Sequence, residues 1–144
     1  NYQPELFLEW HPDKRLGEST LKITRLSFIH QSNGQDVGKS RSWNRTEMFF
    51  LLQHENIFYG LNFWDRWDEK DKVAPNETEG NDNKYLVKYI GAQRYFAKYK
   101  SDKFNVGLYY QTNLFDYDPN LGNIRVDLTL PSINQNLKFF IRYF

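Results

Sequence analysis

His30 and Ser32 have the residue types and the spacing of a serine nucleophile with its base. A serine hydroxyl needs a neighbouring imidazole to accept its proton, and the imidazole needs a third group to fix its tautomer. Residues two apart in extended chain emerge on the same face, so both side chains would lie side by side on a strand. A His-x-Ser pair is also common by chance, and the alternative is two ordinary strand residues.

Asn44 is the candidate for the third member. If residues 21–32 and 44–53 pair as antiparallel strands, Asn44 can lie beside His30 on one face of the sheet. An asparagine carbonyl can accept a hydrogen bond from the imidazole, and because it is neutral it orients the ring rather than compensating its charge. Gly34, in a tight turn just beyond the candidate nucleophile, could present its backbone N–H to a developing oxyanion.

The elements that must position these residues are strands. Apolar and polar residues alternate with a period of two over much of the chain, most clearly in residues 124–130, and no helical pattern competes. About eight strands are predicted, each near the length that a tilted membrane strand requires. They lie around residues 6–10, 21–32, 44–53, 57–63, 85–99, 104–111, 124–130 and 137–143.

The predicted connections form two alternating sets. Short connections are expected at residues 54–56, 101–102 and 131–136, and long ones at residues 33–43, 66–83 and 113–123. An up-and-down barrel puts consecutive connections at opposite ends, and outer-membrane barrels have short turns at one end and longer loops at the other. Segment 11–20 is an exception: the alternation predicts a short connection there, but the segment is long.

Composition narrows the classes of function. The 144 residues suit one domain, and 19 basic against 18 acidic residues give a net charge of +1, which excludes a nucleic acid as an expected partner. Without cysteine, the chain has no disulfide scaffold or thiolate metal site. An aromatic content of 18% fits the girdles of a membrane barrel. It fits a soluble ligand-binding barrel or sandwich with an aromatic core equally well.

Two segments carry a family resemblance. Residues 30–34 (His-Gln-Ser-Asn-Gly) and 40–45 (Ser-Arg-Ser-Trp-Asn-Arg), with the spacing between them, resemble the signature of bacterial outer-membrane phospholipase A. The resemblance implies an all-β, antiparallel, up-and-down transmembrane β-barrel of twelve strands in the bacterial outer membrane. It also implies calcium-dependent hydrolysis of acyl esters of phospholipids and lysophospholipids, with a homodimer as the active state. Because about eight strands are predicted, we expect residues 1–144 to be a single barrel domain truncated at both ends.

The same resemblance assigns roles to individual residues. It implies that Ser32 is the nucleophile, His30 the general base, Asn44 the group that orients His30, and Gly34 the oxyanion donor.

For Ca²⁺ the resemblance implies Ser40 and the backbone carbonyl of Gln35 as ligands. It also implies an aspartate at the position of Val37. The adjacent Asp36 is the carboxylate that could replace it.

The alternative function is a non-catalytic outer-membrane porin or a barrel that binds a hydrophobic ligand. In that case His30 and Ser32 would be ordinary wall residues. Covalent labelling by a serine-directed sulfonyl fluoride separates the two functions, because only an activated serine reacts.

Overall fold

The computed structural model describes residues 2–36, 39, 41–74, 77, 80–81, 83–113, 121–131 and 138–144. Within these residues the chain forms one antiparallel sheet of nine strands and one short helix, α1 (Leu86–Ile90). The strands are β1 (Glu5–Trp10), β2 (Lys14–Leu16), β3 (Ser19–Ser32), β4 (Ser42–His54), β5 (Ile57–Arg66), β6 (Gln93–Lys100), β7 (Asn105–Thr112), β8 (Asn123–Pro131) and β9 (Lys138–Tyr143). No helix in the described part is long and apolar enough to cross a bilayer.

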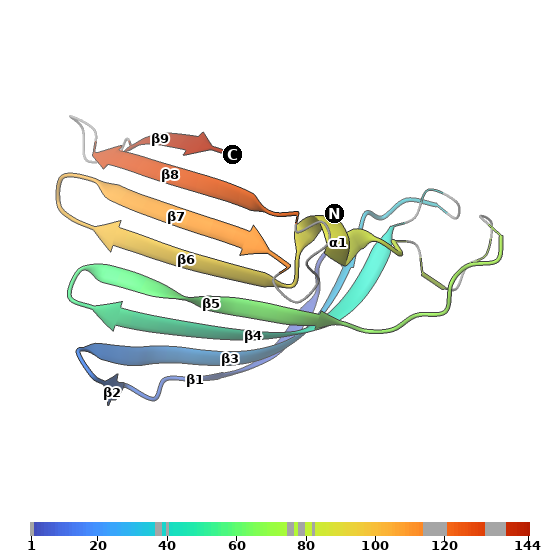
Figure 1. Cartoon of the computed structure of the whole chain (residues 1–144), viewed down its shortest axis with the longest axis horizontal. Coiled ribbons are helices and arrows are strands. Elements are labelled where there is room, and N and C mark those ends of the chain that lie inside the picture. The colour runs from blue at the N-terminus through green and yellow to red at the C-terminus, as the bar shows by residue number, and fades with distance from the viewer. Residues whose placement is uncertain are drawn as a thin grey trace.

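The strands follow one another across the sheet in the order β1-β3-β4-β5-β6-β7-β8-β9, with β2 paired to β3. This order is an up-and-down meander, and Figure 1 shows it as a curved sheet. The β4–β5 and β6–β7 turns lie at one end of the sheet, and α1 with the long β5–β6 connection lies at the other (Figure 1). The predicted antiparallel all-β fold is therefore confirmed, as is the sorting of these connections.

The two faces of the sheet differ in polarity. The face that we call the polar face carries charged and amide side chains, and the face that we call the apolar face carries mostly aliphatic and aromatic ones. The polar face includes Glu5, Glu9, Arg25, Ser27, Arg45, Glu47, Asn62, Arg94, Lys98, Arg125, Asp127 and Arg142. The apolar face includes Leu6, Leu8, Leu26, Phe28, Met48, Phe50, Phe63, Leu108, Val126 and Ile141.

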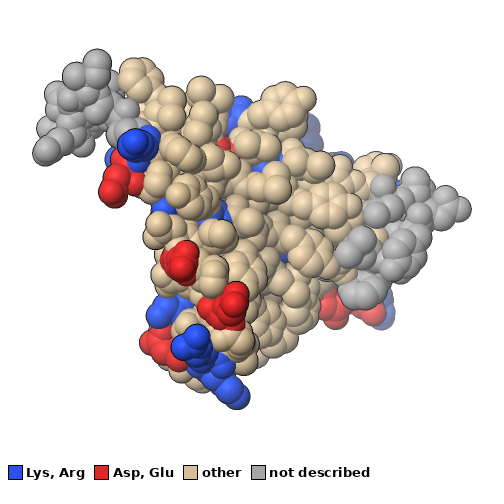
Figure 2. All heavy atoms as spheres, turned by 60° about the vertical axis from the view of Figure 1, so that its left-hand side comes forward, with Lys and Arg blue, Asp and Glu red and all other residues tan. Residues whose placement is uncertain are grey.

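Burial is also divided between the faces. Leu6 and Ile141 on the apolar face are 73% and 56% exposed, which is far from the burial of a soluble core. Figure 2 shows a broad surface with few charged side chains; the charged side chains in this view are most numerous at the lower left, and others lie along the edges. A large apolar surface of this kind marks an interaction with lipid or protein.

The packed centre of the sheet lies on the polar face. Ile29, Trp43 and Trp64 are buried there, so Ile29 fits a face whose other members are mostly polar. The Arg45 guanidinium stacks 4.3 Å from the Trp43 ring and pairs with Glu47 at 3.0 Å. A buried cation is tolerated when it has such partners.

Residues 11–20, the exception among the predicted connections, contain the additional strand β2. The chain turns at Gly17, whose φ of +63° suits glycine, and β2 pairs with the beginning of β3 through Leu16 and Ser19. This segment is long because it includes a small hairpin. This strand was not predicted, because three residues are too few for alternation to be detected.

The prediction of a single strand over residues 85–99 is wrong at its beginning. Residues 86–90 form α1, and the strand β6 starts only at Gln93. Gly91, with φ +74°, ends the helix, and its N–H donates to the carbonyl of Val87 at 2.8 Å. A Cβ at Gly91 would lie 2.2 Å from the carbonyl oxygen of Thr112, so the chain passes close to β7 only because this residue is glycine.

Gly60 generates a prediction about stability. A Cβ at this position would lie 2.0 Å from the Phe50 carbonyl oxygen and 2.9 Å from the Phe96 ring. Because β4 and β5 would have to separate locally, Gly60→Ala should lower the free energy of unfolding by about 1–3 kcal/mol. Heat-modifiable gel mobility of the refolded full-length protein, as a function of urea, measures this change.

The matched control is Gly107→Ala. Its added Cβ would meet the side chain of Tyr109, at 3.0 Å, and a side chain can rotate away. We expect a clearly smaller loss there. Equal stability of the Gly60→Ala variant and the unsubstituted protein would contradict the packing argument.

Candidate active site

His30 and Asn44 lie directly opposite one another on β3 and β4. His30 Nδ1 is 2.8 Å from Asn44 Oδ1. Both side chains belong to the apolar face, the same face as Leu26 and Phe28. The prediction that antiparallel pairing brings Asn44 beside His30 is confirmed.

Ser32 is the last residue of β3 and lies two residues beyond His30 on the same face. In extended chain this separation is about 6.6 Å between Cα atoms, a span that an imidazole can bridge. Among the described residues no hydrogen bond joins the Ser32 hydroxyl to His30. The backbone of Ser32 pairs with Tyr2 through two hydrogen bonds of 2.9 Å. The three predicted residues therefore share one face, and two of them are hydrogen-bonded.

The turn after Ser32 requires glycine at position 34. Gly34 has a φ of +66°, and a Cβ there would lie 2.5 Å from the ring of Tyr2. Asn33 ties the two sides of this turn together: its Nδ2 donates to the carbonyl of Lys39, and its Oδ1 accepts from the N–H of Arg41, both at 2.9 Å. This role of Asn33 was not predicted, because a single asparagine in a polar loop gives no distinctive signal in the sequence.

Two of the predicted calcium ligands are described and one is not. Gln35 and Asp36 are both exposed, and the Asp36 carbonyl accepts a hydrogen bond from the N–H of Lys39 at 3.0 Å. Ser40 and Val37 lie outside the described residues. In the part of the chain that is described, no three His, Asp or Glu side chains gather to hold a metal ion. Asp36 is the carboxylate that this loop offers to a hard cation such as Ca²⁺.

Glu69 is a site residue that the sequence analysis missed. Its Oε1 accepts a hydrogen bond of 2.9 Å from Asn44 Nδ2. Glu69 lies 25 residues beyond Asn44, in a long polar connection that alternation does not describe. No sequence pattern available from one chain would have brought it to Asn44.

An apolar hollow adjoins the His30–Asn44 pair. It has a volume of about 340 Å³, and its walls include Leu6, Phe28 and Trp67 as well as His30 and Asn44. Phe28 and Trp67 meet edge to face at 6.4 Å. The polar pair thus sits beside a surface that could accept a hydrocarbon chain.

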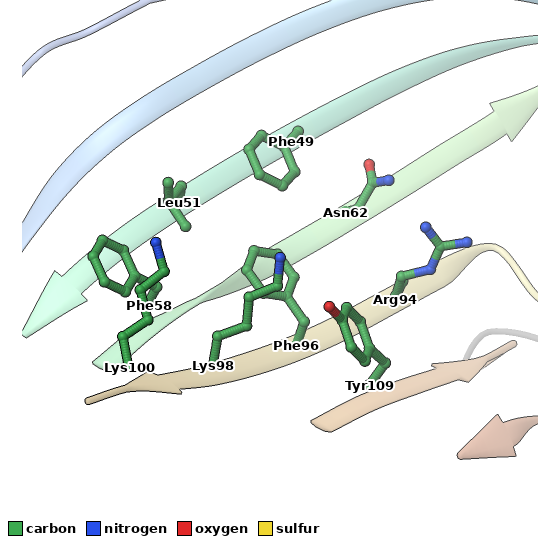
Figure 3. A pocket seen from close by; sticks show the side chains of 9 residues that line it. All are labelled: Phe49, Leu51, Phe58, Asn62, Arg94, Phe96, Lys98, Lys100 and Tyr109. Atoms are coloured by element: carbon green, nitrogen blue, oxygen red, sulfur yellow. The ribbon is translucent and has the colours of Figure 1, made fainter. Parts of the chain in front are cut away.

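A second hollow, also of about 340 Å³, lies on the polar face (Figure 3). Its walls combine cations with aromatic rings, and Lys98 Nζ lies 5.6 Å from the ring centre of Tyr109. None of the residues predicted from the sequence lines it. The predicted chemistry therefore belongs to the opposite face of the sheet.

An exposed ion pair lies within the long β5–β6 connection. Lys84 Nζ lies 2.5 Å from Asp71 Oδ2, and this hydrogen bond raises the pKa of Lys84 above its ordinary value. At the other end of the sheet, a hydrogen bond from Lys22 holds the pKa of Asp13 below its ordinary value. Both pairs are exposed, so each contributes little to stability.

Fold and site together define a class: an antiparallel barrel wall with a histidine–asparagine pair and a serine on its apolar face. The family model of phospholipase A1 matches residues 1–144, and the chain belongs to this family. Phospholipase A1 of Proteus vulgaris is 34% identical over 91 residues, which are 63% of this chain and 28% of that protein.

Two solved structures share the fold. One is outer membrane phospholipase A from Escherichia coli, as a mutant of an active-site asparagine to alanine. The other is the Salmonella typhi outer membrane phospholipase, as a dimer with bound calcium. Each has a TM-score of 0.79 at 23% identity, with 98% of this chain covered. The chain spans 49% and 50% of these two proteins, and thus about half the length of the solved relatives.

Proposed function

We propose that this chain forms much of an outer-membrane phospholipase that hydrolyses acyl esters through Ser32, His30 and Asn44. The observation that carries the proposal is the 2.8 Å contact between His30 Nδ1 and Asn44 Oδ1, two residues from Ser32 on the apolar face. A carbonyl oxygen can only accept, so Nδ1 carries the proton and Nε2 is free to act as a base. The E. coli relative, in which an asparagine belongs to the active site, supports the role of Asn44.

The proposed setting is the lipid bilayer. In a membrane barrel, apolar residues face lipid and polar residues face the lumen, which matches the two faces of this sheet. A sheet edge inside lipid would leave backbone groups unsatisfied. Because the chain spans about half the length of the solved relatives, we propose that further strands pair with β1 and β9 and close the barrel.

In the proposed mechanism Ser32 Oγ attacks the acyl carbonyl carbon while His30 Nε2 accepts the hydroxyl proton. Asn44 holds the ring through Nδ1, and the N–H of Gly34 donates to the oxyanion. Collapse of the tetrahedral intermediate breaks the ester C–O bond, and His30 returns the proton to the departing lysophospholipid. Water then hydrolyses the acyl-enzyme by the same route.

The substrate is proposed to reach the site sideways from the membrane. Ser32, His30 and Asn44 belong to the face proposed to meet lipid, and the adjoining hollow is lined by Leu6, Phe28 and Trp67. An acyl chain that lies in this hollow would place its ester near the imidazole. The lumen, on the other face, is not part of this route.

Ca²⁺ is proposed as the cofactor, with Asp36, the Gln35 carbonyl and Ser40 as its ligands in this chain. Bound near Ser32, a calcium ion would add positive charge where the oxyanion forms. The exposed position of Asp36, in the turn that follows the nucleophile, supports its role as ligand. The solved Salmonella relative, which contains calcium, supports the choice of metal.

A homodimer is proposed as the active state. A hollow on a sheet surface leaves one side of an acyl chain uncovered, whereas sites for such ligands are concave. A second barrel against Leu6, Leu8 and Phe28, which are all exposed, would supply the missing wall. The solved Salmonella relative is a dimer.

The first test of function is Ser32→Ala, measured as release of fatty acid from phospholipid in detergent micelles. Loss of the nucleophile should reduce turnover by at least about 10⁴-fold. Asn44→Ala should be milder, at about 10- to 100-fold, because nucleophile and base remain.

A sulfonyl fluoride should label the unsubstituted protein and not Ser32→Ala. Turnover that survives in Ser32→Ala would disprove the assignment, and unlabelled wild-type protein would favour a non-catalytic barrel.

The second test concerns calcium. Asp36→Asn removes the carboxylate that the loop offers, so the calcium concentration for half-maximal activity should rise by about tenfold, equivalent to the loss of one charged ligand. Asp102→Asn, an exposed residue in the β6–β7 turn at the other end of the sheet, is the control and should leave the titration unchanged. If both variants titrate like the unsubstituted protein, Asp36 is not a ligand.

The third test concerns the dimer. At fixed calcium, with the mole fraction of substrate held constant, turnover per protein should fall as detergent micelles are added, because dilution separates the protomers. A covalently cross-linked dimer should resist this fall. Turnover that is independent of the ratio of protein to micelles, in both preparations, would mean that the monomer is active.

A further inference from the structure

We infer that Glu69 is a positioning residue, which fixes the orientation of the Asn44 amide and through it the tautomer of His30. The inference rests on the proposed function of Ser32, His30 and Asn44. It concerns a residue far from them in sequence, whose carboxylate reaches the amide of Asn44.

The geometry begins with the two ends of the Asn44 amide. Oδ1 lies 2.8 Å from His30 Nδ1, and Nδ2 lies 2.9 Å from Glu69 Oε1. An ionised carboxylate accepts hydrogen bonds and cannot donate them, whereas the two ends of an amide are a donor and an acceptor. Glu69 therefore requires Nδ2 on its side, which leaves Oδ1 facing the imidazole.

The opposite orientation of the Asn44 amide would give His30 the wrong tautomer. With Nδ2 facing His30, the amide would donate to Nδ1, and the neutral imidazole would have to carry its proton on Nε2. That tautomer cannot accept the proton of the Ser32 hydroxyl. Oδ1 would also face the Glu69 carboxylate, acceptor against acceptor. By excluding this arrangement, Glu69 selects the tautomer that can act as a base.

Glu69 is itself held in place. The backbone pairing of β4 with β5 continues past the end of β5, since the N–H of Trp67 donates to the carbonyl of Asn44 at 3.0 Å. Trp67 Nε1 also donates to Thr46 Oγ1 at 2.9 Å. These contacts bring the connection back over β4, and the Glu69 side chain is only 20% exposed.

Arg66 supports the carboxylate from the other side. Its Nη2 lies 3.9 Å from Glu69 Oε2 and donates to Asn81 Oδ1 at 2.6 Å, and its Nη1 donates to the carbonyl of Asn83. Asn83 Nδ2 in turn donates to the carbonyl of Ser42, at the start of β4. Glu69 therefore belongs to a chain of contacts that begins and ends on β4.

Glu69 also explains why an amide suits position 44. An aspartate there would place two carboxylates about 2.9 Å apart, and two like charges at that separation are not both stable. The neutral amide accepts from His30 and donates to Glu69 at the same time. In many hydrolases a carboxylate contacts the catalytic histidine directly. Here the carboxylate of Glu69 contacts Asn44, and Asn44 contacts His30.

The main experiment compares variants of the full-length protein at saturating calcium. Glu69→Ala should lower kcat by about 10- to 100-fold, the range for loss of a partner that orients a functional side chain. KM should change little, since Glu69 does not line the apolar hollow. Glu69→Gln should retain more activity, because its carbonyl oxygen can still accept from Asn44. Asp68→Ala, the exposed neighbouring residue, is the control.

A double-mutant cycle decides whether Glu69 acts through Asn44. In an Asn44→Ala background, Glu69→Ala should cause no further loss of kcat. The exchanged pair Asn44→Asp with Glu69→Gln should be more active than Asn44→Asp alone, since it removes the repulsion between the carboxylates. Equal losses from Glu69→Ala in both backgrounds would overturn the inference.

The tautomer can also be observed without any turnover. The ¹⁵N chemical shifts of His30 should report a proton on Nδ1 in the unsubstituted protein, and a mixture of tautomers in Glu69→Ala. If Glu69→Ala changes neither these chemical shifts nor kcat, the role of Glu69 is overturned. The proposed function would still stand in that case, provided that Ser32→Ala is inactive. Absence of turnover in the unsubstituted protein would instead overturn the function.

Discussion

The register between β3 and β4 is the constraint on which the rest of the site depends. His30 stands opposite Asn44 because each residue from Ile23 to Ser32 has a fixed partner on β4. The side-chain period of a strand is two, so a slip by one residue would move a strand's side chains to the other face. Asn44 would then point into the polar face, away from His30. The apolar residues that share the face with the pair oppose such a slip, because they would be moved at the same time.

The polar face stabilises the alignment of β3 and β4 with their outer neighbours, β1 and β5. Ser27 Oγ donates to Glu5 at 2.6 Å, Arg25 pairs with Glu9, and Asn62 Nδ2 donates to Glu47 at 2.9 Å. Each contact joins different strands and is formed only in the observed alignment. Individually such contacts contribute about 1 kcal/mol. Together they fix the strand alignment, while the apolar face remains available for the lipid and substrate of the proposed function.

Alternation predicted most of the fold and the face on which each candidate residue lies. It succeeded because the alternation of apolar and polar residues is a local property, visible in nearby residues such as Ile124 and Val126. It did not find β2, which is too short, or α1, which ends where Gly91 packs against the backbone of Thr112. That packing depends on a residue 21 positions away, and no local pattern records it.

The candidate site was also predictable only in part. The pairing of His30 with Asn44 follows from two strands and the loop between them, so spacing and alternation were sufficient. Glu69 could not be found, because it reaches Asn44 only after the chain has passed through β5 and returned. Asn33 was missed although it is adjacent to Ser32, since its role consists of loop hydrogen bonds that composition does not reveal.

The pairing of Tyr2 with Ser32 has a consequence for how such a site can work. The backbone of β3 at its last residues is hydrogen-bonded on two sides, to Tyr2 and Pro4 on one edge and to β4 on the other. Hydrolases that mount their serine on a sharp turn hold it by strain in the backbone. Ser32, the proposed nucleophile, lies at the end of a strand that has no residue with positive φ, so in the proposed site the preorganisation would come from the stiffness of the sheet. In the proposed mechanism, the motions left for each turnover are rotations about side-chain bonds, which in exposed residues take place on the nanosecond scale or faster.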